Sequence, residues 1–233
     1  MEASRTRVRR VTLSVVLICT AVALTLPAGP EAKVTGVTFF PGLQPVLVVT
    51  GSSGDDRITV RAKSNPNTGP FYEIYDPDGV DVVPPGCSRE DANTIRCPAQ
   101  GISIVTLAGD AGNDTLVFDI PPGVVDQFDP FFSALGGGGD DVIQGTGFAD
   151  TQNGGPGDDE QFGGGGNDKQ IGGPGDDTQS GQAGNDTQLG GPGNDVQKGG
   201  SGKDTQNCGA GDNDKGVGGG GKDKSKGCEK GKP

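Results

Sequence analysis

The sequence GGGGDDVIQ (residues 136–144) opens a run of eight consecutive nine-residue units that ends at residue 207. The other seven units are GTGFADTQN, GGPGDDEQF, GGGGNDKQI, GGPGDDTQS, GQAGNDTQL, GGPGNDVQK and GGSGKDTQN. Every unit begins with Gly, and seven of the eight have Gly at the fourth place, Phe148 being the exception. The sixth place is always Asp: Asp141, Asp150, Asp159, Asp168, Asp177, Asp186, Asp195 and Asp204. So strict a period predicts a repeat architecture in which each unit forms the same loop and strand.

The spacing of glycine and aspartate within a unit suits a divalent cation. Glycine lets the backbone adopt tight and left-handed conformations, so the first six residues are expected to form a loop whose carbonyl oxygens and Asp carboxylate converge. The last three residues predict a very short strand, with its middle side chain facing inward. Calcium takes about six to eight oxygen ligands from carboxylates and carbonyls. We therefore predict Ca²⁺ as the bound ion.

These units resemble the RTX (hemolysin-type) calcium-binding nonapeptide repeat, and the chain resembles the secreted members of that family that carry an N-terminal signal. The resemblance implies an all-β fold, a parallel β-roll or β-solenoid in which two nonapeptides make one coil and ions lie between stacked loops. It further implies two ladders of ligands, Asp141, Asp159, Asp177 and Asp195 on one edge and Asp150, Asp168, Asp186 and Asp204 on the other. The alternative is a disordered Gly/Asp-rich tract, which we expect in the absence of calcium.

The eighth, inward-facing place departs from the family pattern, which has Leu, Ile or Val there. Only Ile143 follows the pattern, and the other seven units carry Gln: Gln152, Gln161, Gln170, Gln179, Gln188, Gln197 and Gln206. An unpaired buried amide costs roughly 2–7 kcal/mol. Stacked amides can instead hydrogen-bond along the axis, as in cross-β stacks. We predict a polar core of Gln ladders ordered mainly by calcium; the alternative is a solenoid too weak to form fully.

Composition and charge exclude several classes of protein. The 233-residue chain has 45 Gly, no Trp and a formal net charge of −12, so a large conventional core and a nucleic-acid partner are both disfavoured. It has no His, which excludes Ser-His-Asp and Cys-His catalysis. Paired carboxylates such as Asp140/Asp141 recur along the array, unlike a single tuned acid–base pair. We expect a protein that is not an enzyme.

The N-terminus predicts export. Several Arg residues precede an apolar run from Val11 to Leu26, followed by Pro27 and Ala28. This pattern predicts a signal peptide over residues 1–28, an uncleaved anchor being the alternative. Its removal would leave no inserted segment and four cysteines, whose even number in a secreted chain suggests disulfides. Three pairings are possible, and Cys87–Cys97 with Cys208–Cys228 is the local choice.

Residues 33–119 form a more apolar β region. It contains two isolated matches to the repeat, GSSGDDRIT (51–59) and GDAGNDTLV (109–117), which make Asp56 and Asp114 further candidate ligands. Their inward places are Ile58 and Leu116. We predict that this region forms the first, longer and irregular coils of the same solenoid, with an apolar core. A separate small β-sandwich is the alternative.

The remaining segments interrupt or end the period. Residues 120–135 are predicted to be a linker or cap, in which Phe128, Phe131 and Phe132 cover the end of a stack. After Asn207 the register slips by one residue, and the motif returns with Asp223 as its ligand. We expect the roll, residues 136–226, to fray there and residues 227–233 to form a basic tail.

The leading functional prediction is a secreted calcium-binding β-roll without catalysis, ordered by Ca²⁺ after export and acting as an extracellular or cell-surface structural module. The alternative is an adhesin or other ligand-binding protein that uses a solenoid face or the excursion at residues 70–100. Ice binding is disfavoured, because the outward seventh place is too mixed for a regular lattice.

Overall fold

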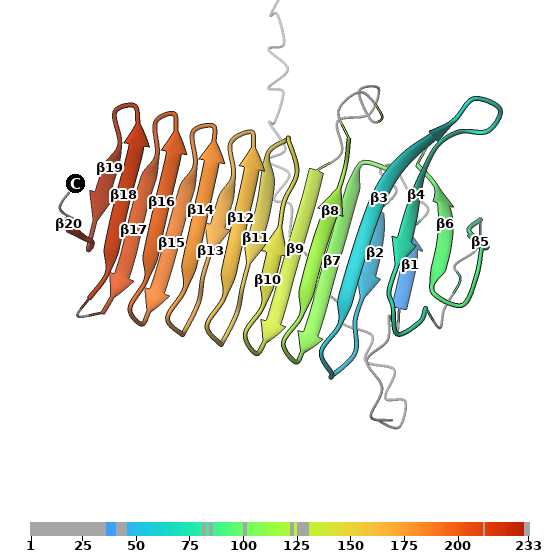
Figure 1. Cartoon of the computed structure of the whole chain (residues 1–233), viewed down its shortest axis with the longest axis horizontal. Helices are drawn as coiled ribbons and strands as arrows, with labels where there is room; N and C mark the ends of the chain where they lie inside the picture. Colours follow the sequence, from blue (N-terminus) through green and yellow to red (C-terminus); the bar gives the residue numbers. More distant parts are fainter. Residues whose placement is uncertain are drawn as a thin grey trace, which may run out of the picture.

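The computed structural model describes residues 36–40, 46–80, 83, 86–99, 102–121, 124, 131–211 and 213–230. The predicted signal peptide, residues 1–28, lies outside these residues. The described chain forms two long β-sheets that face each other along one axis (Figure 1). It contains no helix, and therefore none long and apolar enough to cross a membrane.

From β7 onward the chain alternates between the two sheets, so each coil there contributes one strand to each. The nine-stranded sheet contains β1 (Gly36–Phe40), β2 (Val46–Thr50), β7 (Ile104–Ala111), β9 (Phe131–Gly138), β11 (Asp150–Asn153), β13 (Lys169–Ile171), β15 (Thr187–Pro192), β17 (Thr205–Ala210) and β19 (Lys224–Lys226). The eleven-stranded sheet contains β20 (Glu229–Lys230), β18 (Lys215–Gly220), β16 (Val196–Ser201), β14 (Thr178–Ala183), β12 (Glu160–Gly165), β10 (Val142–Gln144), β8 (Thr115–Asp119), β3 (Arg57–Asn65), β4 (Gly69–Tyr75), β6 (Thr94–Pro98) and β5 (Ser88–Arg89).

Two nonapeptides make one coil, as predicted. Strands two units apart pair in parallel with the same repeat positions opposite each other, for example Gln152 opposite Gln170 and Gln161 opposite Gln179. This register places every sixth-place Asp beside that of the next coil. The roll is therefore all-β and parallel throughout the repeat run.

The N-terminal coils belong to the same solenoid. β2, β7 and β9 pair in parallel, and so do β3, β8 and β10. These coils are longer because they contain insertions: sixth-place aspartates are 58 residues apart from Asp56 to Asp114 and 27 apart from Asp114 to Asp141, against 18 in the regular run. The first insertion forms β4, β5 and β6, which extend the eleven-stranded sheet in antiparallel pairing at the N-terminal end. The region is thus the irregular start of the solenoid, and the separate sandwich is not observed.

The inward-facing columns change from apolar to amide along the axis. In the nine-stranded sheet Val49, Leu107 and Ala134 lie in register and are followed by Gln152. In the eleven-stranded sheet Ile58, Leu116 and Ile143 are followed by Gln161. All of these side chains are buried. One backbone scaffold therefore encloses two chemically different cores.

The buried glutamines form ladders, which confirms the prediction. In one column Gln170, Gln188 and Gln206 each donate from Nε2 to Oε1 of the preceding Gln at 2.9–3.0 Å, and in the other Gln179 and Gln197 do so at 2.7–2.8 Å. Each Nε2 also donates to a backbone carbonyl of the opposite sheet, as Gln179 does to Leu189 at 3.1 Å. The amides thus link successive coils along the axis and the two sheets across it.

Phe131 and Phe132, expected in a linker or end cap, belong to a strand within the stack instead, with Phe131 exposed and Phe132 buried. They begin β9, which pairs with β7 and β11 on its two sides. The Phe132 side chain is fully buried, with its ring centroid 5.1 Å from that of Phe118 and 6.3 Å from that of Phe148. The prediction was wrong because burying an aromatic side chain favours an inward place in a strand over an end. Phe128 lies outside the described residues.

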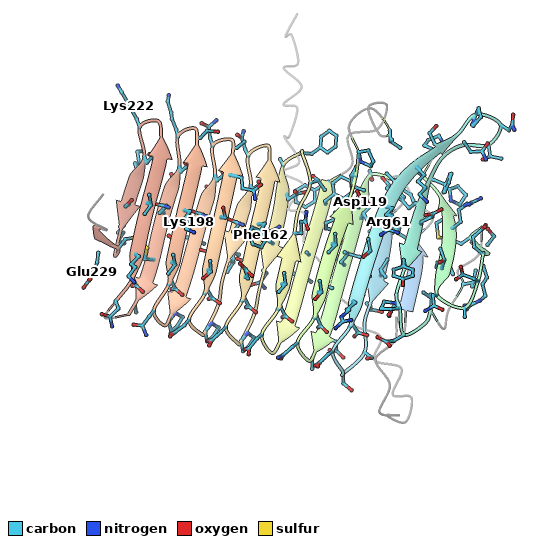
Figure 2. All side chains as sticks on the ribbon, viewed as in Figure 1. Arg61, Asp119, Phe162, Lys198, Lys222 and Glu229 are labelled. Atoms are coloured by element: carbon cyan, nitrogen blue, oxygen red, sulfur yellow. A yellow bond between two sulfur atoms is a disulfide. The ribbon has the colours of Figure 1, made fainter. Side chains whose placement is uncertain are left out.

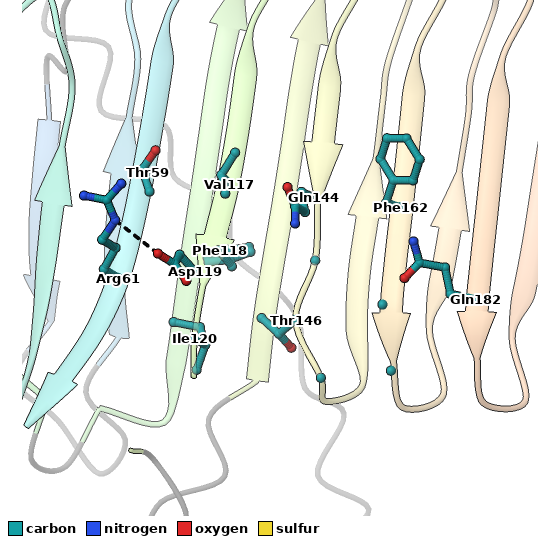
Figure 3. Close-up of a pocket in the computed structure, with 14 residues that line it drawn as sticks. Thr59, Arg61, Val117, Phe118, Asp119, Ile120, Gln144, Thr146, Phe162 and Gln182 are labelled. Atoms are coloured by element: carbon teal, nitrogen blue, oxygen red, sulfur yellow. Dashed lines mark hydrogen bonds and ion pairs between the residues drawn. The ribbon is translucent and has the colours of Figure 1, made fainter. Parts of the chain in front are cut away.

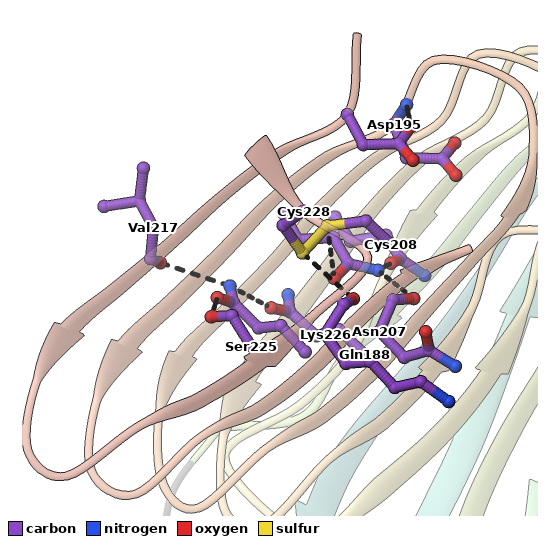
Figure 4. The surroundings of a disulfide bond; sticks show 12 residues. Gln188, Asp195, Asn207, Cys208, Val217, Ser225, Lys226 and Cys228 are labelled. Atoms are coloured by element: carbon purple, nitrogen blue, oxygen red, sulfur yellow. Dashed lines mark hydrogen bonds between the residues drawn. A yellow bond between two sulfur atoms is a disulfide. The ribbon is translucent and has the colours of Figure 1, made fainter. Parts of the chain in front are cut away.

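The roll continues past Asn207, although most side chains of its last strands are exposed. β18, β19 and β20 add parallel pairs, and β20 extends the sheet into the segment assigned to a basic tail. The inward places there are Gly216 and Ser225, and Ser225 Oγ donates to Gln206 Oε1 at 3.1 Å. The Cys208–Cys228 disulfide lies at the end of the core, where a Cβ on Gly216 would be 2.8 Å from Cys228 Sγ (Figure 4). A disulfide and a hydroxyl therefore take over from the glutamines.

Candidate metal sites

The loops that join the two sheets need glycine for close approach. Gly155, at the second place of its unit, has φ +116°, and a Cβ there would collide with the carbonyl oxygen of Gly137 in the preceding coil. Gly136, at a first place, faces a different neighbour. A Cβ on it would collide with Asp141 Oδ2. The glycines thus let each loop stack on the next and let the Asp carboxylate fold inward over its own loop.

The sixth-place aspartates form two continuous ladders. The first edge, which leads into the eleven-stranded sheet, contains Asp56, Asp114, Asp141, Asp159, Asp177, Asp195 and Asp214; each backbone N–H donates to Oδ1 of the next Asp at 2.8–3.0 Å. The second edge, which leads into the nine-stranded sheet, contains Asp150, Asp168, Asp186, Asp204 and Asp223, joined by the same bonds at 2.8–3.0 Å. One carboxylate oxygen of every ladder Asp except the first of each edge, Asp56 and Asp150, therefore holds two coils together.

The second carboxylate oxygen is buried and unsatisfied in most loops. Nine of these side chains are at most 2 % exposed and have an Oδ2 atom without a hydrogen-bond partner: Asp114, Asp141, Asp159, Asp168, Asp177, Asp186, Asp195, Asp204 and Asp214. A buried carboxylate that lacks a partner is costly, and the usual remedy is a cation or a proton. This row of orphaned oxygens is what a bound cation would satisfy.

Backbone carbonyls accompany these oxygens. Around the first glycine of a loop, Asp Oδ2 lies beside a carbonyl oxygen of the next coil: Asp141 Oδ2 with Gly154 O, and Asp186 Oδ2 with Gly199 O. Nowhere among the described residues do three His, Cys, Asp or Glu side chains converge as a metal-binding group. The donor set is thus one or two carboxylates with carbonyls, the hard oxygens that calcium prefers.

Burial also raises the pKa of the loop carboxyl groups. Desolvation raises the pKa of Asp56, Asp114, Asp141 and Asp159 to about 6, and that of Asp150, Asp168 and Asp177 to about 7. The pKa values of Asp186 and Asp195 are raised by the same cause. Without a cation, these carboxyl groups therefore bind a proton at higher pH than an ordinary Asp does.

Two loops differ because their second place is Ser or Thr. Thr146 donates its N–H to Asp150 Oδ2 at 2.6 Å, and its hydroxyl lies 3.1 Å from both carboxylate oxygens. Ser52 N–H donates to Asp56 Oδ2 in the same way, at 2.6 Å. Both Oδ2 atoms therefore have protein donors where the other loops have none. In the sequence, these two loops are marked by a Ser or Thr four residues before the Asp.

The structure brings together every Asp that the sequence singled out and adds Asp214. Asp214 Oδ1 accepts from Asp195 N–H at 2.9 Å, and its side chain is 1 % exposed. It was missed because one extra residue separates it from its loop glycines: the coil spans 19 residues instead of 18. Asp223 ends the second ladder as a half-buried residue.

The eleven-stranded sheet also carries a groove. Thr59, Arg61, Asp119, Gln144, Phe162 and Gln182 are among its lining residues (Figure 3). Arg61 and Asp119 form an exposed ion pair there, with Nε and Oδ2 3.1 Å apart. Figure 2 shows that this pair lies over the N-terminal coils, far along the axis from Lys222 at the C-terminal end.

Comparison with known families agrees with the geometry. Residues 105–119, 135–169 and 171–206 match the RTX calcium-binding nonapeptide repeat in four copies. Searches of curated proteins and of solved structures found no significant match. The matched segments contain both ladders except Asp56, Asp214 and Asp223, and most of the orphaned carboxylate oxygens. These segments are therefore RTX calcium-binding nonapeptide repeats, and Ca²⁺ is the ion that they bind.

Proposed function

We propose that this protein is secreted and that calcium orders its roll after export, so that it acts as a non-catalytic structural module outside the cell or on its surface. The observation that carries the proposal is the row of buried Asp Oδ2 atoms without partners. Such a row is unfavourable without a cation and becomes favourable once ions bind between the loops. The roll is therefore a structure that calcium completes.

The energetics support ordering by the ion. The repeat run 136–207 carries eleven Asp and one Glu against three Lys, a net charge of −9. Charges of one sign at this density repel each other and favour the open chain. Calcium binds the folded loops far better than the open chain, and each site filled at 100 times its dissociation constant adds about 2.7 kcal/mol. Calcium concentration therefore sets the balance between the two states.

Two features support export. The basic and then apolar N-terminus has the pattern of a signal peptide. The disulfides Cys87–Cys97 and Cys208–Cys228 are the kind of bond that persists in oxidising compartments. Calcium there is plentiful enough for modules with weak, extracellular-type affinities. Export would thus bring the protein to a compartment that has enough calcium to order it.

The test is a calcium titration of the purified mature protein, followed by circular dichroism and small-angle X-ray scattering. We expect β signal to rise and the radius of gyration to fall as calcium replaces a chelator, with magnesium as the matched control. Equal compactness in chelator and in millimolar calcium would overturn the calcium-ordering part. Retention of the chain in the cytoplasm when expressed with its own N-terminus would overturn the export part.

Ligand binding is the second candidate, and the groove around Arg61 and Phe162 is the observation that favours it. Its lining combines an ion pair, an amide and an aromatic ring, as carbohydrate or peptide sites often do. The excursion at residues 70–100 instead packs onto the N-terminal end of the roll. A glycan array with the calcium-loaded protein and its Arg61→Ala variant would decide: signal lost in the variant supports a ligand, and no signal in either removes the candidate.

A further inference from the structure

We infer that the two edges of the roll bind calcium with different affinities, the first edge filling before the second and the Lys203 and Lys222 loops filling last. The inference rests on the proposed calcium ordering and concerns the order of the sites. It comes from the fifth place of the repeat, next to the ladder Asp. On the first edge this place is Asp in four loops and Asn in three others, namely Asp55, Asn113, Asp140, Asp158, Asp176, Asn194 and Asn213. On the second edge it is Ala149, Asn167, Asn185, Lys203 and Lys222.

The backbone of both edges is held by the same fifth-place bonds. Asp140 Oδ1 and Asp158 Oδ1 accept from the N–H of the fifth residue in the next coil at 2.9 and 2.7 Å. On the second edge Asn167 Oδ1 and Asn185 Oδ1 accept in the same manner at 2.8 and 2.9 Å. Asp and Asn are thus interchangeable as acceptors here. What differs between the edges is charge and not loop geometry.

The charge difference acts on sites that are otherwise alike. Each edge has buried sixth-place carboxylates with an unsatisfied Oδ2, such as Asp159 and Asp186. The first edge adds an exposed second carboxylate in three successive coils, Asp140, Asp158 and Asp176. Calcium affinity rises with the number of charged groups around the ion. At Lys203 and Lys222 the fifth place instead carries a positive charge, so these loops attract the ion least.

The third place of the repeat acts in the same direction. It is Pro in three first-edge loops, Pro156, Pro174 and Pro192, and never Pro on the second edge. Proline restricts the open chain, so these loops lose less conformational entropy when the ion orders them. A positive φ at a non-glycine second place does not separate the edges, because Asp110 on the first edge (φ +89°) and Gln182 on the second (φ +73°) both have it. Charge and preorganisation therefore both favour the first edge.

The test is residue-resolved. Calcium is titrated into the ¹⁵N-labelled mature protein, and the amide signals of Gly157 and Gly175 are followed for the first edge and Gly202 for the second. We expect half-saturation at lower calcium for Gly157 and Gly175. If ordering proves to be all-or-none, crystals equilibrated at buffered calcium levels give the occupancy of each loop instead. Equal or reversed order overturns the inference, whereas no calcium uptake at all overturns the proposed function.

Matched variants sharpen the result. Asp158→Asn removes one charge but keeps the backbone acceptor, and should raise the half-saturation of its own loop about three- to tenfold, the size expected for a unit charge roughly 6–12 Å from a divalent ion in water-like surroundings. Asn185→Asp adds the same charge on the second edge and should lower half-saturation there by a similar factor. Lys203→Asn should do likewise. The inference is contradicted if a variant shifts the half-saturation of loops on both edges equally. It is also contradicted if adding and removing a negative charge shift the half-saturation in the same direction.

Discussion

The coils before β11 and the coils from β11 onward share one backbone but differ in what fills it. The first set places Val49, Leu107 and Ile143 in its inward columns, and the second set places glutamines there. A buried Leu or Ile contributes about 1.5–3 kcal/mol in any solution condition. A hydrogen bond contributes only about 0.5–1.5 kcal/mol net and does so only where register is already fixed.

From this difference we infer that the Gln core contributes more to fixing the register between strands than to the stability of the roll. Every Gln has partners above, below or across, so a register slip of one residue would leave buried amides unpaired. The loops around that core carry orphaned carboxylates, which oppose folding until they are neutralised. Calcium dependence should therefore be concentrated in the Gln coils and weak in the apolar coils.

The largest expected effect is the response to calcium removal, resolved by region. In chelator we expect amides of residues 150–226 to exchange within seconds, while those of β2, β3, β7 and β8 keep protection, because only the latter bury apolar side chains. Hydrogen exchange with mass spectrometry measures this directly. If all coils lost, or all coils kept, their amide protection in chelator, the two regions would not differ as argued.

The next effect is that acid should partly replace calcium. Burial raises the pKa of Asp141 to about 6 and that of Asp177 to about 7, above the ordinary 3.8. Between about pH 4 and pH 7 the folded roll therefore binds more protons than the unfolded chain, and the free energy of unfolding falls as pH rises. Metal-free protein should gain β signal when acidified from about pH 7 to about pH 5.

Circular dichroism in chelator as a function of pH checks this expectation. Asp176→Asn is the control, because a hydrogen bond from the Asn194 backbone lowers the pKa of exposed Asp176 and so keeps it out of the titrating window. The variant should leave the midpoint unchanged. Loss of β signal on acidification would reverse the sign and refute the explanation.

A pair of core substitutions sharpens the comparison further. Gln179→Ala removes the bonds to Gln161 and Gln197 and should cost roughly 2–3 kcal/mol in calcium-saturated protein. Leu116→Ala should cost about 2–5 kcal/mol through lost burial and a cavity.

The two substitutions should differ most in the metal-free state. There Leu116→Ala should still reduce the residual structure, whereas Gln179→Ala should leave it unchanged. Urea unfolding with and without calcium measures both, and Thr178→Ala, on the outward face, is the control. Equal effects of the two substitutions in chelator would show that the cores do not differ as argued.

The smallest expected effect concerns the loop that satisfies its own carboxylate. Thr146→Val removes the hydroxyl that contacts Asp150 and should lower the stability of the β10–β11 junction by about 1 kcal/mol. The loss should be larger in low calcium than in saturating calcium, because an ion can replace the lost donor. Local exchange of the Asp150 amide measures it, with Thr151→Val as the control. A calcium-independent loss would indicate that Thr146 acts only through packing.

The sequence by itself determined the repeat register, and much follows from it. A strict nine-residue period fixes which residues lie on which face, so the Asp ladders, the Gln ladders and the two-unit coil could be predicted for residues 136–207. The disulfide pairing was chosen among three possibilities because both partners are close in the chain, and the structure contains that pairing.

Only the tertiary structure decided features that depend on contacts between segments separated by insertions. Phe132 stacks between Val105 and Asp150, and Asp214 joins its ladder across a 19-residue coil; neither position follows from local spacing. The separation of Asp and Asn or Lys onto opposite edges likewise becomes meaningful only once alternate units lie on different sides. Local periodicity specifies a strand and which of its faces is buried. Which loop stacks on which depends on the length of chain between successive coils, and this is settled only when the coils pack.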